Sequence, residues 1–244
     1  MTIYQMLTLI SVVLSLGLFI YTYKMGKVKN ARIFSLLMLF ITVFAIGSFF
    51  ELVVRDLSNM LLWRNICQIG YILAVPTLLI MIIDYTGNER FLKPVNIAFV
   101  YAFPVLGLVL RWTDQYHHLM RKDIFLANGQ LVIDSTPFGA VFMFFERAIV
   151  IAAVLMLITF YKRTNPRYKK QLICMVVGTM IPTTVEILKA VSTDMLQTLP
   201  PTAVTLAVTC IIIFWSIFRY QLFSIIPVAQ DKIMDSIHEG IMTE

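Results

Sequence analysis

Long apolar runs separated by short polar loops dominate the chain. Seven of these runs approach the roughly 20 residues that a helix needs to cross the hydrocarbon core of a bilayer. They cover residues 4–23, 33–54, 61–83, 95–110, 138–161, 171–191 and 200–218. The pattern predicts an all-α membrane protein in which residues 1–218 form a bundle of seven transmembrane helices, with its least certain boundaries around the fourth run, which is short and contains Pro104.

Composition supports lipid as the solvent for most of this chain. The sequence is 59% hydrophobic and only 14% charged, with a mean hydropathy of +0.82, whereas a soluble domain carries about 25% charged residues. The net charge of +6 therefore relates to loop topology and not to nucleic acid. The three cysteines lie inside apolar runs without paired spacing, so we expect no disulfide framework, metal site or cofactor.

The loops between the runs differ in charge on the two sides of the membrane. Thirteen of the 20 basic residues follow the first, third, fifth and seventh runs. The positive-inside rule then places the N-terminus outside and the C-terminus in the cytoplasm. The longest outer connection, about 111–137, contains glycine, proline and several β-forming residues, and we expect it to form a small hairpin over the helices.

The pattern changes after the seventh run, in residues 219–244. Apolar residues recur there at three- and four-residue steps with charged residues between them, which is typical of an amphipathic helix in water. Pro227 stands near its start, and Ile226, Ile233 and Ile237 lie on its apolar stripe. We expect a cytoplasmic signalling helix with a homodimer seam, and an output domain beginning where this sequence stops.

Charged residues inside the spans are costly and each needs a reason. They lie in the outer halves of the runs, and three pairs are close in sequence: Glu51 with Arg55, Glu146 with Arg147, and Glu186 with Lys189. One interpretation is an outward-facing polar cavity that binds a small-molecule or lipid-like ligand. The other is that neighbouring helices pair these charges structurally, or that the charges near helix ends extend to the interface.

His117 in the outer loop is a further candidate ligand-binding residue, because imidazole titrates near neutral pH. A metal site there is disfavoured because the sequence offers no full ligand set around His117 and His118. Packing within the loop is the alternative role.

Four stretches, taken in order, resemble the N-terminal seven-transmembrane sensor region of bacterial histidine kinases and related diguanylate cyclases. They are Asp84–Gly87 with Arg90, Trp112–Leu119, Arg167–Gln171 followed by Ile181-Pro182, and Arg219–Phe223 leading into Ile226–Asp231. The resemblance covers nearly all of the chain, and the order and spacing of the stretches carry it more than any one of them.

The resemblance implies a sensory receptor in the bacterial plasma membrane, in contact with membrane lipids. In such proteins the last helix leads into a PAS domain and then a kinase or cyclase. The sequence contains no phosphoacceptor region, ATP-binding glycine boxes or GGDEF sequence, so we expect no catalysis by this chain. A small-molecule transporter is the alternative, although the inner halves of the spans look too apolar for a polar path. A retinal protein would need a lysine in the last span, which has none.

Overall fold

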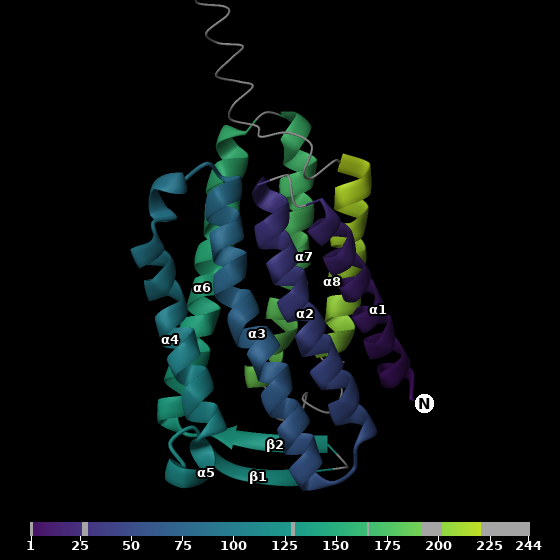
Figure 1. Ribbon diagram of the computed structural model, residues 1–244, viewed down its shortest axis with the longest axis vertical. Helices are drawn as coiled ribbons and strands as arrows, with labels where there is room; N and C mark the ends of the chain where they lie inside the picture. Colours follow the sequence, from purple (N-terminus) through teal and green to yellow (C-terminus); the bar gives the residue numbers. More distant parts are fainter. Residues whose placement is uncertain (1, 26–28, 128–129, 165, 192–201, 221–244) are drawn as a thin grey trace, which may run out of the picture.

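A computed structural model of the chain describes residues 2–25, 29–127, 130–164, 166–191 and 202–220 (Figure 1). Its long helices are α1 (Ile3–Lys24), α2 (Lys29–Val53), α3 (Leu57–Tyr85), α4 (Pro94–Trp112), α6 (Pro137–Arg163), α7 (Pro166–Val191) and α8 (Thr202–Tyr220). The short elements are the 3₁₀ turn η1 (Glu89–Phe91), helix α5 (Asp114–His117) and strands β1 (Arg121–Ala127) and β2 (Gln130–Ser135).

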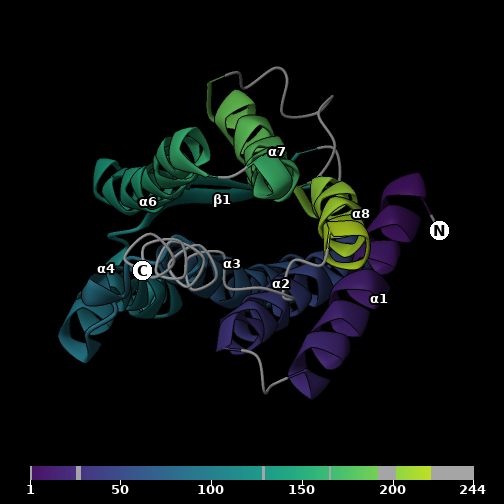
Figure 2. The same cartoon turned by 90° about the horizontal axis from the view of Figure 1, so that it is seen from above.

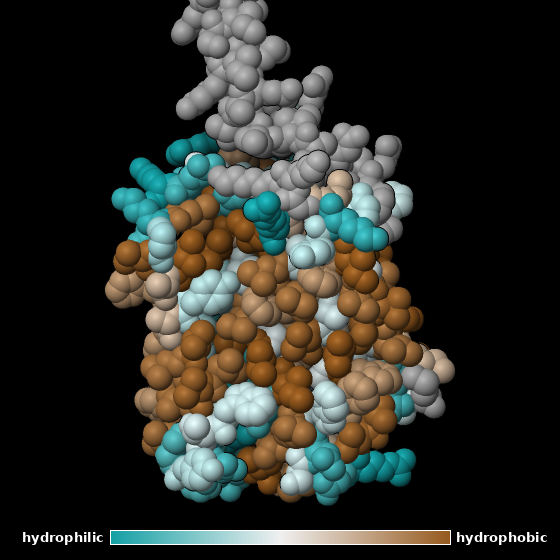
Figure 3. Space-filling model, viewed as in Figure 1, coloured by the Kyte–Doolittle hydropathy of each residue, from teal (hydrophilic) through white to brown (hydrophobic). Residues whose placement is uncertain are grey.

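The predicted all-α membrane bundle is confirmed. Within the described ranges, six helices are long and apolar enough to cross a membrane: α1, α2, α3, α4, α6 and α7. The remaining long helix, α8, has 19 residues and so extends about 28 Å at 1.5 Å per residue. It packs against α1 and α7. Figure 3 shows the resulting apolar belt, with hydrophilic residues gathered at its two ends.

Helix ends follow local signals that satisfy the first backbone N–H groups. The Thr2 hydroxyl and the Gln5 side chain form a capping box at the start of α1. The Asp56 carboxylate caps α3, and the Thr136 hydroxyl caps α6 by accepting from the Gly139 N–H. Because lipid cannot supply hydrogen bonds, such caps and the intrahelical bonds together keep the backbone satisfied inside the membrane.

The bundle has two layers, which Figure 2 shows from above. Helices α4, α3, α2 and α1 form one row, and α6, α7 and α8 form the other. The rows meet at both edges, where α6 packs on α3 and α8 packs on α1. Inside the first row, α2 and α3 approach closely through glycines: a Cβ on Gly70 would lie 2.4 Å from the Phe40 carbonyl oxygen, and one on Gly47 would lie 2.7 Å from the Cys67 nitrogen. Small residues at such crossings are typical of membrane helices.

A buried apolar core fills the end of the bundle where the helix termini carry basic residues. It contains Phe34 and Met38 of α2, Met81 of α3, Leu157 of α6 and Leu172 of α7. Lys24, Arg90 and Lys162 lie in the termini and turns at this end (Figure 1). By the positive-inside rule this basic end faces the cytoplasm.

The opposite, outer end carries the predicted hairpin. Strands β1 and β2 pair antiparallel, from Arg121 with Ser135 to Ala127 with Gln130. The hairpin crosses beneath the ends of the helices (Figure 1). It is held by the Thr136 N–H, which donates to the Met120 carbonyl at 3.2 Å. The expectation of a small hairpin in the 111–137 loop is therefore confirmed.

The expected signalling helix falls almost wholly outside the described residues. α8 continues through Arg219 to Tyr220, but Pro227, Ile226, Ile233 and Ile237 lie in the part of the chain that the structure does not describe. Their roles stay predictions.

Candidate functional site: an outer layer of paired charges above a central cavity

The charges in the outer halves of the helices pair across helices. The Glu51 carboxylate of α2 accepts from Arg64 Nη2 of α3 at 2.5 Å, and the two side chains are 12% and 35% exposed. The Glu146 carboxylate of α6 accepts from Arg111 Nη1 of α4 at 3.1 Å, and these side chains are only 4% and 9% exposed. Each pair joins two helices, so these charges fasten the bundle at its outer end.

Neither arginine partner was recognised from the sequence as part of a site. Sequence proximity instead suggested Arg55 for Glu51 and Arg147 for Glu146. Arg55 lies beyond the end of α2 and is exposed. Arg147 donates through Nη1 to the Met143 carbonyl at 3.1 Å, one turn earlier on α6. A signal did exist, because Arg64 and Arg111 stand at the outer ends of their own apolar runs, at the depth of the two glutamates.

The hairpin is docked onto α3 by a third arginine. Arg121 at the start of β1 donates through Nη2 to Asn65 Oδ1 at 2.5 Å and to Gln68 Oε1 at 3.2 Å. Burial lowers the pKa of the Arg121 guanidinium below its ordinary value, and the nearby Asp114 carboxylate opposes that effect. Asp114 is itself buried and accepts from the Met120 N–H at 2.7 Å.

His117 makes polar contacts within this loop. Its Nε2 lies 3.1 Å from the Thr113 hydroxyl, its Nδ1 accepts from the Leu119 N–H at 3.1 Å, and Nδ1 lies 3.6 Å from Asp114 Oδ1. Both ring nitrogens therefore have partners within the turn. Over the described residues, no three side chains of the metal-ligating types gather in one place.

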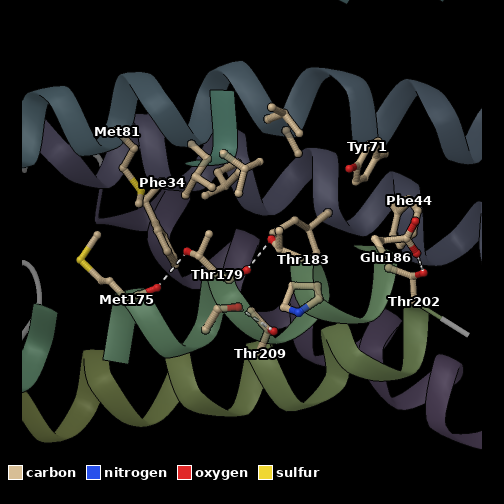
Figure 4. A pocket seen from close by; sticks show the side chains of 18 of the residues that line it. Phe34, Phe44, Tyr71, Met81, Met175, Thr179, Thr183, Glu186, Thr202 and Thr209 are labelled. Atoms are coloured by element: carbon tan, nitrogen blue, oxygen red, sulfur yellow. Dashed lines mark hydrogen bonds between the residues drawn. The ribbon is translucent and has the colours of Figure 1, made fainter. Parts of the chain in front are cut away.

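A cavity of about 140 Å³ lies between the two layers. Its walls come from α2 and α3 on one side, α6, α7 and α8 on the other (Figure 4). The lining extends along α7 from Cys174 to Glu186, a distance of about 18 Å at 1.5 Å per residue. Phe34, Met81 and Met175 stand toward the cytoplasmic end, and Glu186 with Thr202 stands toward the outer end.

Most of the cavity wall is apolar, and its polar atoms are mainly hydroxyls on α7 and α8. The Thr179 hydroxyl donates to the Met175 carbonyl at 2.8 Å, and the Thr183 hydroxyl donates to the Thr179 carbonyl at 2.7 Å. Thr209 of α8 donates to the Gly178 carbonyl of α7 at 3.0 Å. At the outer end, the Thr202 hydroxyl of α8 donates to the Glu186 carboxylate of α7.

Of the seven candidate ligand-binding residues, Glu186 is the one placed in the cavity wall. Glu51 and Glu146 are engaged by arginines, Arg55 is exposed, and His117 lies in the outer turn. Lys189 belongs to α7, and only its backbone is described. Ligand binding by these residues stays a prediction, but the geometry separates Glu186 from the others. Sequence reasoning missed the hydroxyls and aromatic rings around it.

This architecture is that of a multi-pass membrane protein with a cavity inside its helical bundle. The family described as the N-terminal 7TM region of histidine kinase matches residues 7–227, and the chain belongs to this family. The chain is therefore a membrane sensory domain. The family is the sensor region of histidine kinases and is not itself the catalytic part. Among curated proteins, none matches the chain at a significant level.

Proposed function

We propose that this domain senses a small ligand in the central cavity and passes the signal through α8 to a cytoplasmic output module. The observation that carries the proposal is the position of the cavity between the two layers of the bundle. The output module is a histidine kinase in a two-component system of the bacterial plasma membrane, reached through a PAS domain, and the protein acts as a homodimer through that module.

The size of the cavity supports a coupling between occupancy and helix position. A dry protein cavity of about 150 Å³ holds a molecule the size of benzene, and the present cavity is about 140 Å³. A larger occupant that stays between the layers would increase the distance between α7 and the α2–α3 pair. α2 and α3 pack closely at Gly47 and Gly70, so their spacing changes little. The movement would therefore fall on α7 and α8, on the other side of the cavity.

Hydrogen bonds connect α7 to α8, the helix that leads to the cytoplasm. Thr209 and Thr202 of α8 both donate to α7, so the two helices move together. At the cytoplasmic end, the Tyr85 hydroxyl of α3 donates to Gln171 Oε1 of α7 at 2.9 Å, and both residues are buried. α7 is thus held at one end and can tilt at the other. A ligand drives this change only if it binds the tilted state more tightly.

The experiment fills the cavity with a side chain. Ala74 of α3 lines the cavity, and Ala74→Phe adds a ring of the size that the cavity holds. Ala102→Phe on α4 is the matched control, because Ala102 is exposed on the bundle surface. The measurements are native mass spectrometry of the purified domain and autophosphorylation of the full-length protein in membrane vesicles.

We expect a small molecule to co-purify with the wild type and the Ala102→Phe variant and to be lost from Ala74→Phe. The filled cavity also fixes one spacing of the layers. Ala74→Phe should therefore shift basal autophosphorylation by about 5-fold or more, since allosteric coupling energies of about 1–3 kcal/mol correspond to about 5- to 150-fold. An Ala74→Phe protein with the wild-type adducts and wild-type phosphorylation would refute the proposal.

A further inference from the structure

One face of α8 carries a hydroxyl group at every seventh residue. Thr202, Thr209 and Ser216 all line the cavity. Seven residues correspond to about two turns of an α-helix, so the three side chains lie on the same side of α8. The first two hydroxyls donate across to α7, from Thr202 to the Glu186 carboxylate and from Thr209 to the Gly178 carbonyl at 3.0 Å. Hydroxyl groups therefore mark this face of α8 from its outer end toward its cytoplasmic end.

The hydroxyl of Ser216 differs from the other two. Ser216 is 2% exposed, and its Oγ forms no hydrogen bond within the described part of the chain. The register of the two hydrogen bonds above places Ser216 at the level of Gln171 on α7, and Gln171 Oε1 accepts from the Tyr85 hydroxyl. A helical serine often donates to the carbonyl four residues earlier, but Ser216 makes no such bond. A buried hydroxyl without a partner is costly, so its position in a cavity wall points to a ligand.

The surroundings of Ser216 suit hydrocarbon. Toward the cytoplasmic end the cavity lining includes Phe34, Leu37, Met81 and Met175. Methionine side chains adapt their shape to irregular apolar partners. An occupant of this end therefore meets a mainly apolar wall together with the unpartnered Ser216 hydroxyl.

The distribution of charge in the wall favours a neutral occupant at this end. Among the described residues that line the cavity, Glu186 is the one with a formal charge. It stands at the outer end beside Thr202, which is 14 residues before Ser216 on α8, or about 21 Å at 1.5 Å per residue. Glu186 is engaged there by Thr202 and has a further interaction. A charged group near Ser216 would lose its hydration without gaining a partner of opposite charge, which is costly.

We propose that Ser216 is a ligand-binding residue, and that the ligand is a small neutral molecule, apolar except for a hydrogen-bond acceptor such as a carbonyl or ether oxygen. The Ser216 hydroxyl donates to that oxygen, and the rest of the ligand packs against Met81 and Met175. This contact joins the ligand directly to α8, the helix that leads to the cytoplasm. The inference rests on the proposed function, because it names the chemical class of the ligand and a residue that binds it.

The experiment compares three probes of nearly equal size that differ in one group. Cyclohexanone carries a carbonyl acceptor, methylenecyclohexane replaces its oxygen by carbon, and cyclohexylamine is positively charged at neutral pH. Each has a six-membered ring, which suits a cavity of about 140 Å³. The purified domain is washed in detergent to remove co-purified molecules. Each probe is then titrated, and its dissociation constant is obtained from the rise in unfolding temperature.

Two variants are compared with the wild type. Ser216→Ala removes the proposed donor. Ser15→Ala is the matched control, because Ser15 is buried on α1, donates to the Val12 carbonyl at 3.2 Å and does not line the cavity. The same probe in the same detergent is compared between proteins, so partition of the probe into the micelles affects each protein equally.

We expect cyclohexanone to stabilise the wild type and to bind it more tightly than cyclohexylamine does. In Ser216→Ala, the dissociation constant of cyclohexanone should rise about 5-fold or more, the factor that corresponds to one net hydrogen bond. The dissociation constant of methylenecyclohexane should be the same for both proteins within about 2-fold, because this probe accepts no hydrogen bond. Ser15→Ala should bind all three probes as the wild type does.

Four results would overturn the assignment. They are no stabilisation by cyclohexanone, tighter binding of cyclohexylamine, equal affinity of cyclohexanone for the wild type and Ser216→Ala, and an equal loss of affinity for cyclohexanone and methylenecyclohexane in that variant. Each leaves the proposed function to its own test, because Ala74→Phe fills the cavity whatever the chemistry of the ligand. Wild-type phosphorylation by Ala74→Phe, with the selectivity of Ser216 intact, would instead show a binding site without a sensory role.

Discussion

The buried ion pair between Arg111 and Glu146 gives the sharpest test of the outer charge layer. The two side chains are 9% and 4% exposed, and the charged atoms are 3.1 Å apart. With an effective dielectric constant of about 20, their gross attraction is about 5 kcal/mol. Most of this attraction offsets the desolvation of the two groups, so the pair adds little net stability compared with apolar side chains.

The same balance predicts a large non-additivity between substitutions. Glu146→Leu leaves the Arg111 guanidinium buried without its partner. Arg111→Met likewise leaves the Glu146 carboxylate buried without its partner. Each single change should cost about 3–5 kcal/mol of unfolding free energy. The double variant removes both charges, and it should be more stable than either single variant by about 2–4 kcal/mol.

The assay is reversible unfolding of the purified domain in mixed micelles, followed by circular dichroism. The pair between Glu51 and Arg64 is the internal comparison, because Arg64 is 35% exposed. Its loss should cost less than the loss of the Arg111–Glu146 pair, because one of its two side chains keeps about a third of its surface accessible. Additive effects of Arg111→Met and Glu146→Leu would refute this reasoning. Wild-type signalling by the double variant would also assign Glu146 a structural role instead of a ligand-binding one.

Two further predictions concern packing between helices. Gly70→Ala should destabilise the bundle by about 1–3 kcal/mol, because the new methyl group meets backbone atoms of α2. Gly17→Ala on α1, where no atom lies within 4 Å of the new Cβ, should instead be neutral or stabilise by up to about 1 kcal/mol. Tyr85→Phe should cost about 1 kcal/mol by removing the hydrogen bond to Gln171, and should raise amide exchange in the first turns of α7. Tyr116→Phe, on an exposed ring, should stay within about 0.5 kcal/mol. Equal stabilities within either matched set would contradict the packing described here.

The membrane spans could be predicted well because they depend on a local property, the length of each apolar run. The expected and observed ends differ by about five residues at most, and prolines mark several starts: Pro94, Pro137 and Pro166. The prediction of the hairpin also depended on local signals, because Gly129 stands between the two short β-forming stretches and Pro137 follows them. Neither prediction required knowledge of which helices are neighbours.

Partners across helices could not be predicted in the same way. Glu146 and Arg147 are adjacent in sequence, but adjacent helical residues point about 100° apart. Glu146 therefore faces α4 and meets Arg111, whereas Arg147 hydrogen-bonds to its own helix. For Glu51, the helix ends at Val53, before Arg55, so the carboxylate turns to Arg64 instead. Such pairings follow from the order of helices in the bundle, and apolar run lengths carry no information about that order.

Sequence reasoning suggested an outward-facing polar cavity, but it could not predict the central position and mainly apolar wall of the cavity found here. These depend on how the helices pack. Glycines bring α2 and α3 together, and the Tyr85–Gln171 hydrogen bond holds α7 at the cytoplasmic end. Along its outer half α7 packs on α8, to which it is joined by Thr209 and Thr202. The two layers are also joined at their edges, where α6 packs on α3 and α8 packs on α1. Under the proposed function, an occupant would therefore change the spacing of the layers in the middle of the bundle, and α8 is the described helix that would carry this change toward the cytoplasm.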